Sequence, residues 1–194
     1  MNEHLAGFGA IHAHVFEQAY KFKPLLNITL DQDATFIPTS SKNALYNYHG
    51  EKAHEAFNTY CPEYDIIVGT QFRDGNVNPG FGQLEELKRV LSTIPEGVEE
   101  VTLRSDTAGY QEDILRYCAE GANDRFGEIG FTISCKIVES FKQAAKAIPE
   151  EDWKPVIKEV TKDGVTELKE TGQEWAEVAY VPDWTLKRAC FKSS

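Results

Sequence analysis

The chain has 194 residues, of which 41% are hydrophobic and 26% charged, and its formal net charge is −11. These values are ordinary for a soluble protein of about one domain, and no apolar run is long enough to span a membrane. The N-terminus lacks the basic-then-apolar pattern of a signal peptide. Without a membrane span or a signal peptide, we expect a cytoplasmic protein without a membrane partner. The four cysteines form no Cys-x-x-Cys pair, so we interpret them as free thiols.

The negative charge is concentrated in the first part of the chain. Residues 1–135 hold 10 Lys and Arg against 20 Asp and Glu, whereas residues 136–194 hold 10 against 11. Affinity for phosphates comes mainly from Lys and Arg. A chain of this charge is therefore a poor nucleic-acid binder on its own.

Hydrophobic periodicity predicts alternating helices and strands along the chain. Leucines at positions 84, 87 and 91 recur at helical spacing, whereas residues 27–37 alternate between polar and apolar as a strand does. Consecutive apolar residues within 64–72 predict a strand that is buried on both faces. In chain order the patterns predict a helix over 8–22, strands over 27–37, 53–60 and 64–72, a helix over 84–94, a strand over 101–106, a helix over 110–120, a strand over 127–133, a helix over 138–148, a hairpin over 157–168 and a strand over 175–181.

This order of elements predicts a fold of the α/β class. Three strands in succession, followed by alternation of strands and helices, indicate a mixed β-sheet with helices on its faces. The same order is found in ribonuclease-H-like folds. In those folds an aspartate of the first strand and one of the fourth strand come together, and the corresponding residues here are Asp33 and Asp106.

The predicted first strand carries two carboxylates on one face. Asp31 and Asp33 occupy odd positions, whereas the even positions hold mostly apolar residues. Two carboxylates so close together repel each other and are more stable near a cation. Asp106 falls at the carboxyl end of a later strand, where open α/β sheets bind their ligands. A strand face that is simply solvated explains the spacing of Asp31 and Asp33 equally well.

Four motifs extend the pattern beyond these acids. They are Leu-Asp-Gln-Asp-Ala-Thr (30–35), Phe-Arg-Asp-Gly-Asn-Val (72–77), Leu-Arg-Ser-Asp-Thr-Ala-Gly-Tyr (103–110) and Gly-Gln-Glu-Trp-Ala-Glu-Val (172–178). From about residue 25 to Trp184, the chain resembles insertion-sequence transposases that have a DDE domain of group 1 and a ribonuclease-H-like catalytic core. The resemblance implies an N-terminal helical segment over 1–24, the core over 25–150, and an inserted β-rich segment with a divergent tail over 151–194.

The resemblance also implies roles for individual residues. Asp33, in the Asp-x-Thr element, and Asp106, in the Arg-x-Asp element, match the family's first two catalytic aspartates, and Asp31 is a further candidate metal ligand. The implied cofactor is Mg²⁺ or Mn²⁺, and the implied partner is DNA at transposon ends. A homodimer is compatible with it. Two ions held by carboxylates can activate water or a 3′-hydroxyl and stabilise the leaving oxygen of a phosphodiester.

The chain departs from the family pattern after Trp184. The family completes its metal site with a glutamate on a helix that follows the inserted segment, and no such setting occurs there. Glutamates that could replace it lack the family's surrounding sequence; they are Glu139, Glu150, Glu151 and Glu174. We therefore expect the chain to correspond to a truncated piece of a transposase that is inactive alone and binds DNA weakly or not at all.

Two other interpretations stay open at this level. A non-catalytic remnant or interaction module would share the same motifs without the complete site. Phosphatases of the haloacid-dehalogenase type use Asp-x-Asp-x-Thr after a hydrophobic strand, which would make Asp31 the nucleophile and Asp33 the acid–base. Those enzymes also need a late acidic pair in a Gly-Asp-x-x-x-Asp setting, and no such motif follows residue 120.

Overall fold

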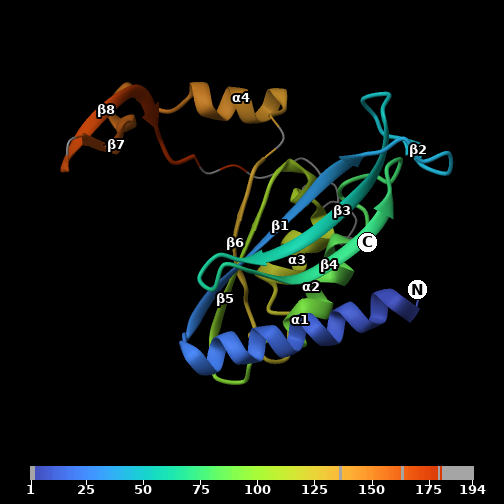
Figure 1. Ribbon diagram of the computed structural model, residues 1–194. Coiled ribbons are helices and arrows are strands. Elements are labelled where there is room, and N and C mark those ends of the chain that lie inside the picture. Colours follow the sequence, from blue (N-terminus) through green and yellow to red (C-terminus); the bar gives the residue numbers. More distant parts are fainter. Residues whose placement is uncertain (1–2, 136, 163, 179, 181–194) are drawn as a thin grey trace, which may run out of the picture. The chain divides into compact units, whose positions relative to one another are not determined.

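The computed structural model describes residues 3–135, 137–162, 164–178 and 180 of the chain (Figure 1). The chain divides into two compact units, Met1–Lys136 and Ile137–Ser194. Among the described residues, no helix combines the length and the apolar composition that crossing a membrane requires.

The first unit contains one sheet and three α-helices. Its elements are α1 (Glu3–Phe22), β1 (Asn27–Pro38), β2 (Leu45–Tyr46), β3 (Lys52–Cys61), β4 (Ile66–Asp74), α2 (Gln83–Leu91), β5 (Glu100–Ser105), the 3₁₀ turn η1 (Thr107–Gly109), α3 (Glu112–Ala119) and β6 (Gly130–Ile133). The main strands lie in the order β4–β3–β1–β5–β6, and β2 pairs with β3 beside β4. β3 is antiparallel to β1 and β4, whereas β5 is parallel to both β1 and β6. The predicted mixed sheet flanked by helices is therefore confirmed.

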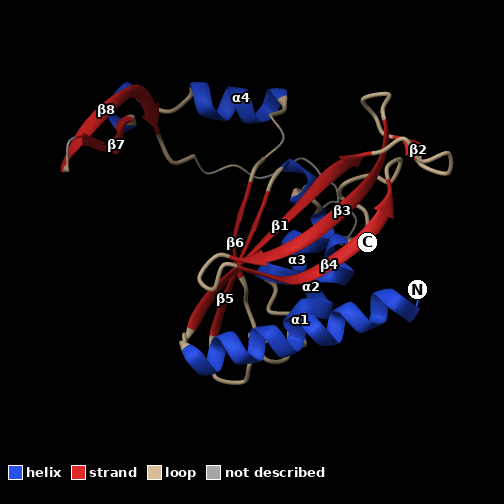
Figure 2. Ribbon diagram, in the orientation of Figure 1, coloured by secondary structure: helices blue, strands red, loops and turns tan. Residues whose placement is uncertain are grey.

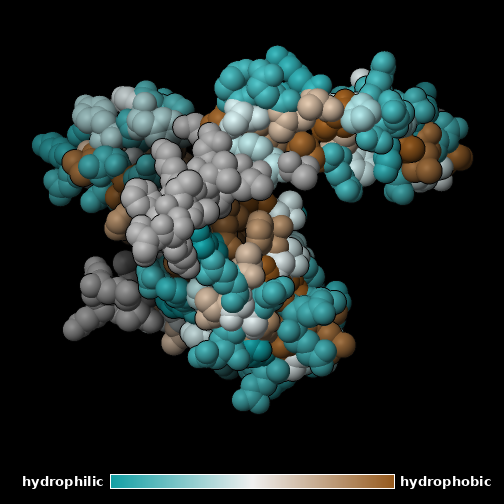
Figure 3. All heavy atoms as spheres, turned by 180° about the vertical axis from the view of Figure 1, so that it is seen from behind, coloured by the Kyte–Doolittle hydropathy of each residue, from teal (hydrophilic) through white to brown (hydrophobic). Residues whose placement is uncertain are grey.

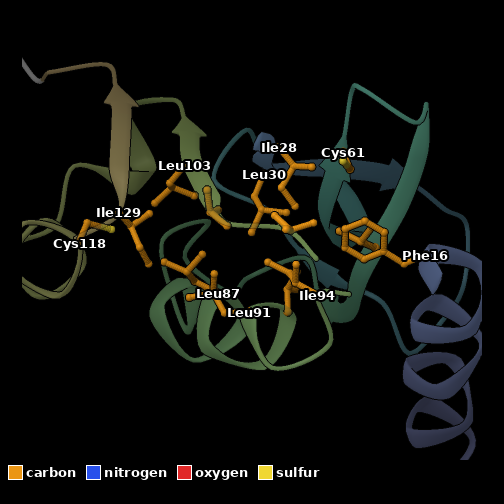
Figure 4. Packing of buried hydrophobic residues seen from close by; sticks show 14 of the residues in the cluster. Phe16, Ile28, Leu30, Cys61, Leu87, Leu91, Ile94, Leu103, Cys118 and Ile129 are labelled. Atoms are coloured by element: carbon orange, nitrogen blue, oxygen red, sulfur yellow. The ribbon is translucent and has the colours of Figure 1, made fainter. Parts of the chain in front are cut away.

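The helices α1, α2 and α3 lie on one side of this sheet (Figure 2). Each contributes side chains to the same core, among them Phe16 from α1, Leu87 from α2 and Cys118 from α3 (Figure 4). The strands meet them with alternate residues such as Leu30 and Leu103, both buried. Period-two alternation thus assigns one set of strand residues to the core and leaves the intervening set on the opposite face.

A polar network is buried in the same layer. Glu55 on β3 forms an ion pair of 3.2 Å with Arg73 on β4, and both side chains are buried. Arg73 also donates to Gln71 Oε1, and Gln71 Nε2 donates to Glu86 Oε2 over 2.8 Å. Glu86 in turn pairs with Arg89 in α2. Burial raises the pKa of Glu55, while the charge of Arg73 acts in the opposite direction.

The second unit contains a short helix and a two-stranded ribbon. Its elements are α4 (Glu139–Lys146), the 3₁₀ turn η2 (Glu150–Asp152), β7 (Lys154–Lys162) and β8 (Val165–Trp175). The ribbon leaves apolar residues exposed on both strands, for example Ile157 and Leu168. Figure 3 shows such residues, in brown, at the surface of the molecule among hydrophilic ones in teal. A two-stranded ribbon alone is at best marginally stable in water.

The structure corrects two sequence predictions. No separate strand spans 175–181: β8 ends at Trp175, because its partner β7 begins at Lys154, opposite Trp175, and the described residues 176–178 and 180 lie outside any strand. Residues 179 and 181 lie outside the described range. Within the strand predicted to be buried on both faces, Ile67 is exposed, because only one face of the sheet there packs against helices. Cys61 and Cys118 are buried free thiols, as the sequence predicted, whereas Cys190 is not among the described residues.

Candidate functional site

The candidate site is built on the open face of β1. Ile28 and Leu30 point into the core, which leaves Asp31 half-buried and Asp33 exposed on the other face. Thr35 lies on the same face, and its hydroxyl donates to Asp33 Oδ2 over 3.4 Å. The predicted alternation is therefore confirmed for these residues, and both carboxylates are on one face.

Asp31 already has a cation beside it. Arg104 of β5 lies directly across from Asp31 in the parallel register, and its Nη2 contacts Asp31 Oδ2 at 2.5 Å. The hydrogen bond to Asp31 raises the pKa of Arg104, and the negative charge of Asp31 adds to this shift. The repulsion between the two β1 carboxylates is thus relieved by a protein side chain on the Asp31 side.

Asp106 follows the last residue of β5 and begins the 3₁₀ turn η1. Its Oδ1 accepts a hydrogen bond of 2.9 Å from the backbone N–H of Ala108, so the side chain caps this turn. An aspartate at such a position is held by the first N–H groups of the turn. The orientation of this carboxylate is therefore fixed by backbone that follows it in the chain.

The strand register brings together the residues that precede Asp33 and Asp106. Gln32 of β1 pairs with Ser105, the last residue of β5; Asp33 follows Gln32 within β1, and Asp106 follows Ser105 just outside the strand. Ser105 Oγ donates to the backbone oxygen of Gln32 over 3.2 Å and ties the strands together at this point. Adjacent strands lie about 4.8 Å apart, so the two backbones are direct neighbours here.

A dense set of contacts supports the turn after Asp106. Gln111 Nε2 donates to the backbone oxygens of Gly80 and Ala108, both over 2.8 Å, and to Gln83 Oε1 over 3.0 Å. A Cβ at Gly80 would lie 2.8 Å from Gln111 Nε2 and 2.9 Å from Ala108 O. At Gly109 it would lie 2.5 Å from Ser105 Oγ. Because such contacts leave no room for a side chain, both glycines are required by close approach.

A shallow depression of about 270 Å³ opens beside the β1 carboxylates. It is lined by residues of β1, β3 and β4, namely Asp31, Asp33, Thr35, Asn58, Tyr60 and Ile67. Asn58 pairs with Asp33 across the antiparallel ladder, and Tyr60 pairs with Asp31. The depression therefore offers carboxylate, hydroxyl and amide groups together with an apolar wall.

The residues of β3 and β4 in this depression were missed by sequence reasoning. Asn58 Oδ1 accepts from Thr70 Oγ1 over 2.6 Å, and the Tyr60 hydroxyl donates to Asp65 Oδ1 over 2.7 Å. This hydrogen bond raises the pKa of Tyr60. The alternation of 52–61 could have assigned Asn58 and Tyr60 to the open face, but only the register shows that they lie opposite Asp33 and Asp31.

The carboxylate oxygens in this region are of the type that binds a hard divalent cation. Mg²⁺ and Mn²⁺ prefer carboxylate oxygens and keep several waters, so two aspartates can suffice for a weak site. Asp33 is exposed, and the cap to Ala108 uses only one of the two carboxylate oxygens of Asp106. Within the part of the chain that the structure describes, no group of three or more His, Cys, Asp or Glu side chains is arranged to hold a metal ion.

Comparison with known proteins identifies no family for this chain. No protein-family model matches the chain, and no curated protein sequence matches it. A functional assignment therefore depends on the four sequence motifs and on the geometry around Asp33 and Asp106.

Proposed function

We propose that the chain is the ribonuclease-H-like core of a DNA transposase, in which Asp33 and Asp106 bind Mg²⁺ or Mn²⁺ at a DNA phosphodiester. The observation that carries the proposal is the register that pairs Gln32 with Ser105, the residues directly before the two aspartates, which are 73 residues apart in sequence. The sheet supports it as well. Three antiparallel strands followed by two parallel ones agree with the ribonuclease-H-like order expected from the sequence.

The neighbours of the two aspartates favour distinct roles for them. Arg104 neutralises Asp31, which favours Asp33 over Asp31 as the metal ligand and Asp31 as the residue that positions Arg104. Ala108 N–H orients the Asp106 carboxylate, and Gln111 holds the turn to which Ala108 belongs. When bound, the ions would activate the attacking oxygen and stabilise the leaving oxygen of the phosphodiester.

The β7–β8 ribbon carries several lysines on one face, which answers part of the objection that an acidic chain binds DNA poorly. On one face of the β7–β8 ribbon, Lys158 lies directly opposite Lys169, and Lys162 lies on the same face. Glu167 pairs with Lys169 there, so the face keeps an excess of positive charge. Like charges placed directly across a ladder are destabilising in isolation, and a bound phosphate would relieve them.

The proposal is tested by metal binding. Isothermal titration of the chain with Mn²⁺ should give weak binding, and Asp33→Asn should weaken it about tenfold or more, because one of two protein ligands is lost. Asp31→Asn is the matched control: it removes a carboxylate from the same strand face and should retain Mn²⁺ affinity. Equal affinity in wild type and Asp33→Asn would refute the assignment of the site.

Cleavage by the isolated chain should be slow or absent. Two-metal phosphoryl transfer requires both ions to be fixed so that attacking and leaving oxygens lie in line, and misplacement of about 1 Å can cost about a hundredfold in rate. With two carboxylates, we expect the second ion to be held loosely. A plasmid-nicking assay with Mn²⁺ on the chain and on Asp106→Ala checks this. Clear nicking that disappears in the variant would show that another ligand completes the site.

A further inference from the structure

The end of the sheet around β2 projects beyond α2 and α3 (Figure 1). Exposed aromatic residues lie in this part of the chain. Tyr48 and His49 lie with ring centroids 4.0 Å apart, and Phe36 of β1 packs edge-on against Tyr48 at 5.3 Å. Tyr46 is 62% exposed and Tyr48 71%. We refer to Tyr46, Tyr48 and His49 as the aromatic tip. Its rings have open faces, which core aromatics do not.

The turn that carries these rings is built by a buried side chain. Asn47 Oδ1 accepts hydrogen bonds of 3.0 Å from the backbone N–H groups of His49 and Glu51. The Asn47 N–H donates to Glu51 O over 2.8 Å, and Gly50 closes the turn with a φ of 81°. An Asn that bonds its own following backbone fixes a turn locally. The rings are thus presented by ordered backbone, so a ligand would have little conformational entropy to remove.

The aromatic tip also differs from the rest of the chain in charge. The 17 residues from Ala34 to Gly50 contain no Asp or Glu, although the chain has 31 of them, and this is its longest stretch without an acid. Lys42 lies within it, and Glu51 and Lys52 follow it. Lys52 Nζ lies 5.7 Å from the centre of the Tyr46 ring and donates to the backbone oxygens of Ser41 and Lys42. A polyanion can therefore approach here with less repulsion than elsewhere.

We propose that the aromatic tip is a stacking platform for unpaired nucleobases of a DNA strand. Every base has a π-face, so exposed rings with nearby cations bind single strands with little sequence preference. Bases inside a duplex are already stacked and are not available to the rings. Phe36 lies three residues after Asp33 in β1, and the period-two alternation places its side chain on the opposite face of the sheet from Asp33. The choice of DNA rests on the proposed function, in which the platform would bind unpaired nucleotides at this end of the same sheet.

The test is binding of a short fluorescein-labelled thymidine oligonucleotide to the full chain, measured by anisotropy in EDTA at about 50 mM salt, where weak phosphate contacts still count. Tyr48→Ala should raise the dissociation constant about 5- to 150-fold, whereas Tyr48→Phe should retain most of the affinity. Phe22→Ala is the control, because Phe22 is an aromatic residue of α1 that is 92% exposed and distant in sequence from the platform. Equal melting temperatures of the Tyr48 variants would exclude unfolding as the cause of a loss.

Each other outcome has a defined meaning. No binding by the wild type, equal binding by Tyr48→Ala, an equal loss in Phe22→Ala, or equal affinity for the same strand in a duplex would overturn the platform. A change in oligomeric state of Tyr48→Ala without a change in oligonucleotide binding would assign these rings to a second copy of the chain instead. If oligonucleotide binding depends on Tyr48 while Mn²⁺ binding proves independent of Asp33, the platform stands and the proposed active site fails.

Discussion

The two faces of strand β3 have opposite characters, although their residues alternate one by one along the chain. Glu55 and Phe57 face the helices and are buried, whereas Asn58 and Tyr60 face outward beside the candidate site. The buried set contributes packing and one ion pair to stability. The outward set offers polar groups: Asn58 accepts a hydrogen bond from Thr70, and Tyr60 donates one to Asp65. Residues that stabilise the fold and residues that line the candidate site thus alternate along β3. Substitutions at neighbouring positions should therefore affect one property without the other.

The largest effect is expected for Phe57→Ala on the packed face. The ring is fully buried, and the guanidinium of Arg73 lies 4.1 Å from its centre. Removal should lower the free energy of unfolding by about 3–5 kcal/mol, through lost burial and the cavity left behind. The adjacent Asn58→Ala should cost less than about 1.5 kcal/mol, the worth of a typical hydrogen bond. Urea unfolding of both variants checks this, and equal losses would contradict the separation of the two faces.

The second effect concerns the buried charge on the packed face. Burial raises the pKa of Glu55 above its ordinary value of 4.5, so the folded chain holds this proton more tightly than the unfolded chain. Glu55 therefore contributes stability below pH 4.5, and this contribution is lost as the pH rises through the raised pKa. Each unit of difference between folded and unfolded pKa is worth about 1.4 kcal/mol.

The effect of Glu55 is measured by comparing the free energy of unfolding of two proteins. The free energy of unfolding of the wild type minus that of Glu55→Gln should fall as the pH rises from 4.5 toward neutrality. Because the subtraction cancels the other titrating groups, their own pH dependence does not enter. A difference that rises with pH would mean that Arg73 outweighs burial at this position.

A smaller effect is expected where the turn after Asp106 is held. Gln111→Ala removes the donor to Gly80 O and Ala108 O and should cost about 1–2 kcal/mol, because these oxygens lose a hydrogen bond. If Gln111 positions Asp106, Mn²⁺ affinity should fall as well, by about tenfold as for other residues that orient metal ligands. Gln143→Ala, at an exposed glutamine of α4 that donates to Glu139, is the control. Lost stability with unchanged Mn²⁺ affinity would limit Gln111 to a structural role.

The smallest effect belongs to the ion pair on the open face. Arg104 and Asp31 are only partly shielded from water, so Arg104→Ala should change the free energy of unfolding by less than about 1 kcal/mol. Raising the salt concentration should shrink even that difference, since exposed pairs are screened. Denaturation at low and high salt checks it. A loss comparable to that of Phe57→Ala would show that both faces carry stability.

Local structure was predictable from the sequence where one periodicity dominates. The alternation from Asn27 to Ile37 predicted the strand and the common face of Asp31 and Asp33, because side-chain direction in a strand depends on local geometry alone. Leucine spacing likewise predicted α2. The extent of α1 was underestimated, because its first turn, beginning at Glu3, precedes the apolar stripe.

Properties that depend on pairing could not be predicted in the same way. The ion pair between Arg104 and Asp31 follows from a register of parallel strands that are far apart in sequence. The exposure of Ile67 depends on which face of the sheet the helices cover. The end of β8 at Trp175 depends on where β7 begins. Each is a property of two segments together, and a single-segment pattern carries no information about it.

The two glycines around the Asp106 turn have a consequence for the variation that the chain can tolerate. An aspartate that binds a cation can be exchanged for another oxygen ligand with partial retention of binding. Position 80, between Gln111 Nε2 and Ala108 O, and position 109, against Ser105 Oγ, have no volume for even one methyl group. In a library of random substitutions, these two positions should thus return glycine more strictly than positions 33 and 106 return aspartate. Selection for function at this site would therefore constrain Gly80 and Gly109 most strictly, although glycine has no functional group.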